Sequence, residues 1–382
     1  MLRSHRAPND FLSGDAGRPA RAGFSRIHKL LMGALDMRQH LVAAAVAAAL
    51  GILAQAAHAD DDTTVGGRMY ADFSNISQDK NGNTTDADGT GFDVKRFYLI
   101  IDHKFDDIWS ANLTTDFNYV ANDSETNLFV KKAYVQAKLD DYFMVRGGSA
   151  DMPWIPFVES WYGYRYIDPT VTDRLKFANS ADWGIHALSV TSGMFNYAVS
   201  VVNGNGYKNP SRSSGMDFEG RVGFQPIEGL MIAGGGYSGD RGVDVESAPS
   251  KHTASRWDVM AAYKGGPFRV GAEYFSSDDW NQVAKAPTDK SDGWSVWGSW
   301  AFTPEWGIFA RYDSAKLSKD LDPTAKDTYY NAGVEWTVRK GIRISGVWKH
   351  EDAKSSPANA DGVPVFAKIK TDEIGVYTEI SF

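Results

Sequence analysis

Apolar and polar residues alternate along most of the chain from about residue 67 onward. In residues 109–119, Trp109, Leu113 and Phe117 share one face, while Asn112 and Asp116 lie on the other. The same alternation recurs in residues 329–339 and 342–349. A period of two predicts β-strands that have one apolar and one polar face.

Sixteen strands are predicted from this pattern. They begin near Gly67, Phe92, Ile108, Leu128, Tyr142, Ala181, Met194, Asp217, Leu230, Ala254, Phe268, Gly293, Trp306, Thr328, Ile342 and Glu373. The connections alternate in length: 106–107 and 140–141 are short turns, whereas 75–91 and 203–215 are long polar loops. Such alternation is typical of an up-and-down transmembrane β-barrel with short periplasmic turns and long outer loops. Because lipid offers no partner to the backbone, the strands must close into a barrel with the apolar face outward.

Several aromatic residues fit this all-β, antiparallel barrel. Residues 373–382 alternate up to a terminal Phe382, an ending typical of Gram-negative outer-membrane barrels, in which the insertion machinery reads the aromatic end. Tryptophans near strand ends fit interface belts that contact outer-membrane lipid. They are Trp109, Trp257, Trp294, Trp306 and Trp348.

The segment Asp151 to Ser180 interrupts the pattern, because it shows neither strand alternation nor a clean helical stripe. Its aromatic, proline and charged residues form the third long connection. We expect it to fold into the barrel lumen as a pore constriction. The alternative is a loop that packs on the outside of the same strands.

The N-terminal region predicts export. Residues 1–36 are basic and patternless, and we interpret them as a non-native or mis-annotated extension. A short polar region from Met37, an apolar run from Leu41 to Ala57 and the motif Ala57-His58-Ala59 predict a signal peptide over 37–59 that is cleaved before Asp60. A membrane anchor is the alternative, but the run is short and a cleavage motif follows it directly. Residues 60–382 are then the barrel domain.

Composition limits the classes of function. Setting aside the 7 basic and 3 acidic side chains of residues 1–59 from the 40 and 48 of the whole chain leaves 33 and 45, a net charge of −12. This balance gives no sign of nucleic-acid binding. The absence of cysteine removes disulfides, thiolate nucleophiles and thiolate metal sites. Cofactors are not expected. A calcium site among Asp79, Asp86 and Asp88 is a generic alternative to a solvated loop.

Several stretches resemble the phosphate-selective porin O and P family. They include residues 92–99 (FDVKRFYL), 109–116 (WSANLTTD), 132–135 (KAYV), 146–148 (RGG), Pro153, Glu159, 163–166 (GYRY) and 182–184 (DWG). The resemblance covers essentially all of residues 60–382. It implies a sixteen-stranded trimeric channel whose third outer loop enters the lumen. Family members bind phosphate with inward Arg and loop Lys residues, but residues 151–180 lack a dense Lys cluster.

Inward polar faces predict which charged residues line the pore. The predicted lining residues are Arg68, Arg96, Asp116, Lys132, Arg146, Arg221, Arg269, Arg311, Arg339 and Arg343. The predicted constriction residues are Glu159, Arg165, Asp168, Arg174 and Lys176. Arg165 and Arg174 are expected either to contact an anionic solute or to pair with Asp168, Asp173 or a wall carboxylate. The other inward charges either select ions or pair across neighbouring strands.

The favoured function is a passive porin for small hydrophilic solutes, among them anions such as phosphate. The alternatives are a general or carbohydrate-type pore, in which loop aromatics stack on a sugar, and a plugged structural barrel. An enzyme is not expected. His186 lies four residues after Asp182, but no Gly-x-Ser-x-Gly motif or His-rich metal spacing accompanies it.

Overall fold

The computed structural model describes residues 62–119, 126–189, 193–246, 248, 250–355 and 367–382. The extension expected over 1–36 and the signal peptide expected over 37–59 lie outside these residues. The remaining unit, Asp60–Phe382, is described by itself.

Strands make up nearly all of this unit. In chain order they are β1 (Thr63–Lys80), β2 (Asn83–Thr84), β3 (Gly89–Lys104), β4 (Trp109–Tyr119), β5 (Thr126–Lys138), β6 (Met144–Asp151), β7 (Ala181–Leu188), β8 (Phe195–Val202), β9 (Asp217–Ile227), β10 (Leu230–Gly239), β11 (Ala254–Gly265), β12 (Phe268–Asp278), β13 (Lys290–Ala301), β14 (Trp306–Lys316), β15 (Lys326–Arg339), β16 (Ile342–Ser355) and β17 (Ala367–Ser381).

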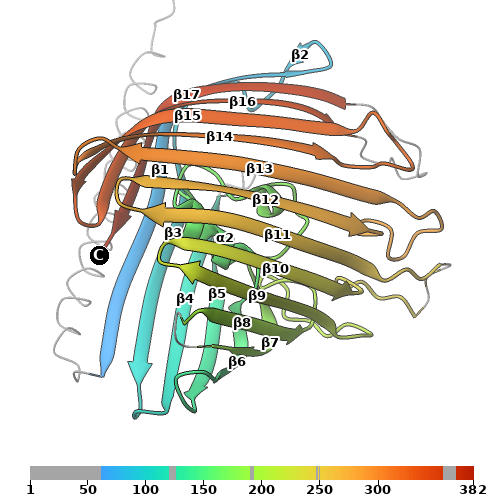
Figure 1. Cartoon of the computed structure of the whole chain (residues 1–382). Coiled ribbons are helices and arrows are strands. Elements are labelled where there is room, and N and C mark those ends of the chain that lie inside the picture. The colour runs from blue at the N-terminus through green and yellow to red at the C-terminus, as the bar shows by residue number, and fades with distance from the viewer. Residues whose placement is uncertain (1–61, 120–125, 190–192, 247, 249, 356–366) are drawn as a thin grey trace, which may run out of the picture. The chain divides into compact units, whose positions relative to one another are not determined.

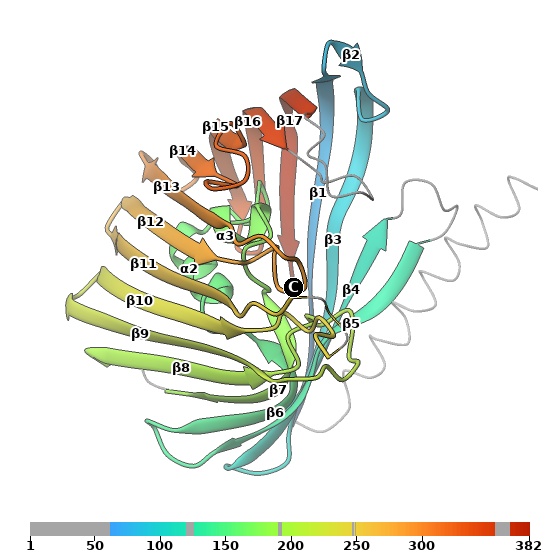
Figure 2. The same ribbon diagram turned by 90° about the vertical axis from the view of Figure 1, so that its right-hand side faces the viewer.

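The long strands form one closed antiparallel barrel. Each strand pairs with the next in the chain, and β1 pairs with β17 from Arg68 opposite Ser381 to Lys80 opposite Ile369. Closure continues at the chain end, where Phe382 and Gly67 exchange two main-chain hydrogen bonds of 3.0 and 3.1 Å. Figures 1 and 2 show the ring of strands from two sides. The predicted sixteen-stranded barrel is therefore confirmed, with β2 as a small addition.

Most predicted strand starts lie within four residues of the observed ones, and two features depart further from the sequence prediction. The last strand begins at Ala367 rather than near Glu373, because residues 367–372 extend the ladder to β1 and β16 with polar side chains, Lys368, Lys370 and Asp372, on the face that carries Ile374 and Val376 further along the strand. β2 closes a two-residue hairpin on β1 at Asn81 and Gly82, whose φ angles are 54° and 86°. Asn-Gly is the preferred pair for such a turn, because both positions need positive φ.

Two belts of aromatic side chains ring the outer face of β11–β16. Toward the long loops, the rings of Trp257 and Tyr274, of Trp294 and Tyr312, and of Tyr330 and Trp348 lie 5.1 to 5.3 Å apart. Toward the short turns, neighbouring strands stack Phe268 on Trp300 and Trp306 on Trp336. On β13 the two belts are about 20 Å apart along the strand. Aromatic belts that flank an apolar band mark the two membrane interfaces.

Two helices interrupt the strands. They are α2 (Ile155–Tyr162) and α3 (Val171–Arg174), and both lie between β6 and β7 in the chain. Neither helix is long and apolar enough to cross a membrane, and the same holds for the rest of the described residues. Figure 2 shows α2 and α3 inside the ring of strands. The predicted placement of the third long loop in the lumen is therefore confirmed.

The lipid-facing band allows a test of the membrane assignment. Ala310 is exposed on β14 and pairs with Gly298 and Ala332, midway between the two belts. We expect Ala310→Arg to lower the free energy of unfolding by about 2–4 kcal/mol, because the guanidinium must enter hydrocarbon. Thr303→Arg, in the turn before β14, should cost at most about 1 kcal/mol. Urea titration in lipid vesicles measures both, and equal costs would contradict the placement of the band.

Candidate functional site

The candidate site is built around residues 152–180, which we call the inner loop. Proline stands at the start of α2, where its missing N–H is not needed, and Gly163 ends α2 with a left-handed φ of 78°. Thr170 precedes the single turn of α3. Two short helices joined by bends explain why the sequence showed neither a strand nor a long helical stripe.

Aromatic packing fixes one side of the inner loop to the barrel wall. Trp154 is fully buried and lies against β10, where a side chain at Gly235 would meet the indole at 2.8 Å. Tyr164 stacks on Phe309 of β14, with ring centroids 4.4 Å apart. The hydroxyl of Tyr166 lies 2.6 Å from that of Ser345. The aromatic residues considered for sugar stacking thus mainly anchor the loop.

Basic side chains of the barrel wall bind the main chain of the inner loop. Six of them donate hydrogen bonds to main-chain carbonyls of the inner loop. The pairs are Arg221 with Pro153, Arg269 with Tyr162, Arg343 with Gly163, Lys349 with Ile167, Arg311 with Pro169, and Arg256 with Phe177. Four of the residues predicted to line the pore, which are Arg221, Arg269, Arg311 and Arg343, therefore bind the inner loop.

Carboxylates of the barrel wall also attach the inner loop, because they accept hydrogen bonds from its main-chain N–H groups. The amide N–H of Trp154 donates to Glu219 at 2.9 Å, and that of Val171 donates to Glu273 at 3.3 Å. Glu219 is in turn paired with Arg256 at 3.0 Å, and both side chains are essentially inaccessible to solvent. A buried carboxylate needs such a partner, because an unpaired charge away from water is costly.

The predicted constriction residues are held by ion pairs. Within the loop, Arg165 pairs with Glu159 and lies 3.4 Å from Asp173. Arg174 instead reaches three wall carboxylates, which are Asp313, Asp327 and Glu351, at 3.2, 2.5 and 2.5 Å. Among the described residues, both arginines therefore form ion pairs with carboxylates.

Asp168 and Lys176 complete the predicted set. Asp168 pairs with Lys349 at 2.9 Å and accepts a hydrogen bond from the hydroxyl of Tyr329 at 2.6 Å. Burial alone would raise the pKa of Asp168, but the Lys349 ammonium and these hydrogen bonds outweigh it and lower the pKa. Burial raises the pKa of Glu159 against the opposing effect of Arg165. Lys176 is three-quarters exposed and lies 3.9 Å from Asp173.

Two cavities lie on either side of the inner loop. The upper cavity, toward the long loops, has a volume of about 320 Å³ and is lined by Lys95, Arg96, Lys349, Glu351 and Glu373, among others. The lower cavity, toward the short turns, has a volume of about 750 Å³ and is lined by Arg68, Lys131, Lys132, Asp151 and Glu379, among others. Tyr70 and Arg165 line both cavities and so mark the boundary between them.

The remaining predicted lining residues lie mostly along β1 and β3–β6. Arg96 donates to Asp116 at 3.0 Å, Lys132 pairs with Asp151 at 2.8 Å, and Arg68 lies 3.7 Å from Glu379. Arg146 donates to Gln136 at 3.1 Å, and its guanidinium lies over the ring of Tyr134. Arg339 is exposed at the turn end of β15, beside a register shift, and lines neither cavity.

Two lumen lysines were missed by the alternation pattern. In β3 the register shifts so that Arg96 and Val94 find partners while Lys95 is passed over. The same happens at Lys131 of β5, between Val130 and Lys132. A bulge lets two successive residues face one side, so a strict period of two cannot find them. The Lys131 ammonium lies 4.7 Å from the ring centre of Tyr98.

Other candidate chemistry has an ordinary structural explanation. Asp79 and Asp88 accept hydrogen bonds from the N–H groups of Gly82 and Gln78. Within the residues that the structure describes, no group of three or more His, Asp or Glu side chains is placed to hold a metal ion. His186 of β7 lies 2.8 Å from the hydroxyl of Ser200 on β8.

Comparisons with known proteins agree with this geometry. A family model described as Gram-negative porin matches residues 43–356. Among solved structures, the fold is similar to the anion-selective porin from Comamonas acidovorans, with a TM-score of 0.61 and 14% identity over 84% of this chain and 99% of that one. It is also similar to the outer membrane channel DcaP of Acinetobacter baumannii, with a TM-score of 0.59 and 12% identity over 84% and 97%. The fold is similar as well to the trimer form of OmpT from Vibrio cholerae, with a TM-score of 0.52 and 15% identity over 84% of this chain and 100% of that one. No curated protein matches the sequence significantly.

The attachment of the inner loop can be tested at Arg311. This side chain is buried, donates to the Pro169 carbonyl and pairs with Asp313. We expect Arg311→Met to lower the free energy of unfolding by about 3–5 kcal/mol, because it leaves buried polar groups without a partner. Single-channel recordings should also show larger current fluctuations as the loop loosens. Arg339→Met is the matched control and should change neither quantity; equal effects of both variants would contradict the anchoring role.

Proposed function

The chain belongs to the Gram-negative porin family, and from that premise we propose that it is a general diffusion channel with a weak preference for small anions. Like the other members of the family, it is an outer-membrane β-barrel channel and not an enzyme. What remains to be proposed is which solutes it favours, which residues select them and how the chain assembles.

The observation that carries the proposal is the way in which lumen charges are paired. Four of the strongest candidates for an arginine track, Arg221, Arg269, Arg311 and Arg343, are bound to the inner loop. The arginines of the loop itself are bound to carboxylates. A ring of free charges of one sign selects ions strongly, whereas paired charges do so weakly. This favours a general pore over a dedicated phosphate channel.

A weak anion preference is proposed from the cavity linings. In the upper cavity the basic side chains Lys95, Arg96, Arg165, Arg174 and Lys349 face three acidic ones, which are Asp168, Glu351 and Glu373. In the lower cavity the basic side chains Arg68, Lys131, Lys132, Arg165, Arg269 and Arg343 face four acidic ones, which are Asp102, Asp151, Glu159 and Glu379. In both cavities the described lining therefore carries two more basic than acidic groups.

Arg165 at the boundary of the cavities provides the direct test. Arg165→Ala removes one positive charge and leaves Glu159 and Asp173 without it, so we expect the channel to shift toward cation selectivity. The zero-current potential in a planar bilayer under a potassium chloride gradient measures this shift. Arg165→Lys keeps the charge and should retain most of the preference, and Arg339→Ala should leave the potential unchanged.

The same bilayer separates the two classes of channel. A general pore should not be blocked by inorganic phosphate at concentrations far below that of chloride. Block at low phosphate together with marked anion selectivity would reject the proposal in favour of a phosphate-selective channel. An unchanged potential in Arg165→Ala would reject the role of Arg165.

A homotrimer is proposed from the uneven outer face. In the band toward the long loops, β1, β3 and β5 carry exposed Phe73, Phe92 and Leu128, with no exposed Trp or Tyr among the side chains described there. The Trp and Tyr side chains that form the belt of β11–β16 toward the long loops thus have no counterpart among the described side chains of this face, where a protein surface would replace lipid headgroups. We further propose removal of residues 37–59 as a signal peptide and recognition of Phe382 by the insertion machinery.

The trimer is testable by crosslinking, because the chain contains no cysteine. We expect Leu128→Cys to give crosslinked oligomers with a short bifunctional maleimide in outer-membrane vesicles. Val296→Cys, which is exposed on β13 among lipid-facing residues, is the matched control and should stay monomeric. Monomers from both variants would argue against an interface on β1–β5.

A further inference from the structure

Four lysines lie side by side on neighbouring strands of the barrel, at the end toward the long loops. Lys316 of β14 is directly opposite Lys326 of β15, and Lys354 of β16 is directly opposite Lys368 of β17. The register of β15 against β16 places Lys326 beside Lys354, so the four residues form one continuous row. All four side chains are exposed. We call these four residues the lysine row.

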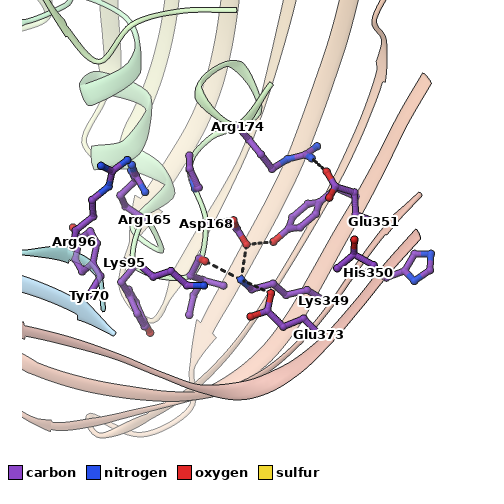
Figure 3. Close-up of a pocket in the computed structure, with 15 residues that line it drawn as sticks. Tyr70, Lys95, Arg96, Arg165, Asp168, Arg174, Lys349, His350, Glu351 and Glu373 are labelled. Atoms are coloured by element: carbon purple, nitrogen blue, oxygen red, sulfur yellow. Dashed lines mark hydrogen bonds and ion pairs between the residues drawn. The ribbon is translucent and has the colours of Figure 1, made fainter. Parts of the chain in front are cut away.

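The lysine row lies on the outer face of the barrel, as β16 shows. Lys349 reaches into the upper cavity, and the ring of His350 is turned away from it (Figure 3). Because successive residues of a strand alternate between the two faces, Lys354 shares the outward face with His350 and Trp348. Trp348 belongs to the aromatic belt toward the long loops. The row therefore lies on the lipid-facing side of the strands, toward the outer leaflet.

The lysine row is well outside this belt. Lys316 is four residues beyond Tyr312 on β14, and Lys326 is four residues before Tyr330 on β15. Four residues of strand measure about 14 Å, which is about 10 Å along the membrane normal at the usual tilt of a barrel strand. The headgroup layer of one leaflet is about 5–8 Å thick. The row thus lies at the height that a lipid with a tall headgroup reaches.

The cations of the row repel one another. Like charges that are directly opposite on neighbouring strands destabilise a sheet. Of the row, only Lys368 has an ion pair among the described residues, and its partner Asp352 is 3.7 Å away and is shared with Lys370 at 4.0 Å. Lys316, Lys326 and Lys354 therefore keep their charge without a carboxylate partner in the described part of the chain.

The other carboxylates beside the row already have partners. Asp292 of β13 is opposite Lys316, but its side chain binds Lys319 at 2.5 Å. Asp372 of β17 lies 2.8 Å from the imidazole of His350. Asp79 of β1, at the far edge, accepts a hydrogen bond from the main chain of its own turn. A row of cations that the protein itself does not neutralise can serve an anion from outside.

We propose that the lysine row binds the phosphorylated sugar headgroup of a glycolipid in the outer leaflet. Lysine ammonium groups bind phosphate as point charges. Neighbouring strands are about 4.8 Å apart, so the row spans about 14 Å. This width accommodates one phosphate between Lys316 and Lys326 and a second between Lys354 and Lys368. The acyl chains lie below, along the apolar band that carries Ala310 and Ala332.

Two other occupants fit the row less well. The phosphate of a glycerophospholipid lies within the headgroup layer, near the belt and below the lysines. A second copy of this chain would have to bury the row, but lysine is depleted at the centre of protein interfaces. The row is also on β14–β17, outside the face of β1–β5 that we propose for the trimer. The inference concerns the membrane and is independent of the solute that the channel passes.

The test measures the binding of lipopolysaccharide, a glycolipid with several phosphate groups on its sugars, to the purified full-length channel in neutral detergent micelles. Fluorescently labelled lipopolysaccharide gives the Kd. The comparison probes are the same lipid after enzymatic removal of its phosphates and phosphatidylglycerol, an anionic phospholipid. We expect lipopolysaccharide to bind at least about tenfold more tightly than either probe, as two or more additional lysine contacts would give.

Variants assign the binding to the row. Lys326→Gln should raise the Kd for lipopolysaccharide about fivefold, and the double variant Lys316→Gln/Lys326→Gln about twentyfold. Lys326→Arg keeps the charge and should retain the binding. Arg339→Gln/Lys340→Gln is the matched control, because it removes the same charge from exposed residues of the short turn between β15 and β16. This control should leave the Kd unchanged.

Urea unfolding gives a second readout, which a purely structural role of the row would not reproduce. Without lipopolysaccharide, Lys326→Gln relieves like-charge repulsion and should raise the midpoint of unfolding. With saturating lipopolysaccharide, the same change removes a ligand contact and should lower the midpoint below that of the unmodified channel. A change of the same sign in both conditions would contradict the binding role.

The outcomes also separate this inference from the proposed function. Equal Kd values for the unmodified channel and for Lys316→Gln/Lys326→Gln would overturn the site. Equal binding of the dephosphorylated lipid would do so too, because it would assign the affinity to the acyl chains, and tighter binding of phosphatidylglycerol would assign the row to a phospholipid. A preparation that binds lipopolysaccharide but does not conduct would reject the diffusion channel alone.

Discussion

The demand that every main-chain polar group in a membrane finds a partner shapes the whole molecule. Within the bilayer, strands satisfy this demand only by closing on themselves, and here β1 pairs with β17 over thirteen residue pairs. The inner loop meets the same demand in a different way. Its irregular backbone lies inside the barrel, and six basic side chains of the wall bind its carbonyls where a strand would otherwise do so.

This attachment explains why a lumen rich in arginine need not be a strongly selective one. A guanidinium that binds a carbonyl or a buried carboxylate acts mainly as a structural group, and its charge is partly neutralised where it stands. Arg256 is the extreme case, because it holds Glu219, Asp258 and the Phe177 carbonyl with no exposure to solvent. Selectivity is left to the cations at the cavity surfaces that keep the fewest carboxylate partners among the described residues, chiefly Lys131, which contacts Tyr98, and Arg96, which has Asp116.

The sequence predicts the barrel well because membrane strands obey a strong, local rule. Alternation is unbroken in β14 and in β15 up to Thr337, and the predicted beginnings of many strands agree with the structure, as at Asp217, Ala254 and Trp306. The site is harder to predict. Lys95 and Lys131 face the lumen only because bulges shift the register. The partners of Arg174 come from β14, β15 and β16, and their convergence depends on how the loop folds, which no local pattern encodes.

The arrangement of charges on the walls follows from the position of the loop. The inner loop leans against β9–β16, so the basic side chains of those strands are drawn into contacts with the loop. On β3 and β5 the loop does not bind the cations that line the cavities: Lys95 and Arg96 pair with Asp72 and Asp116 of the wall, and Lys131 contacts Tyr98. One attachment thus produces the narrow lumen and at the same time neutralises most of the charge on the wall that faces the loop, because a buried charge needs a partner.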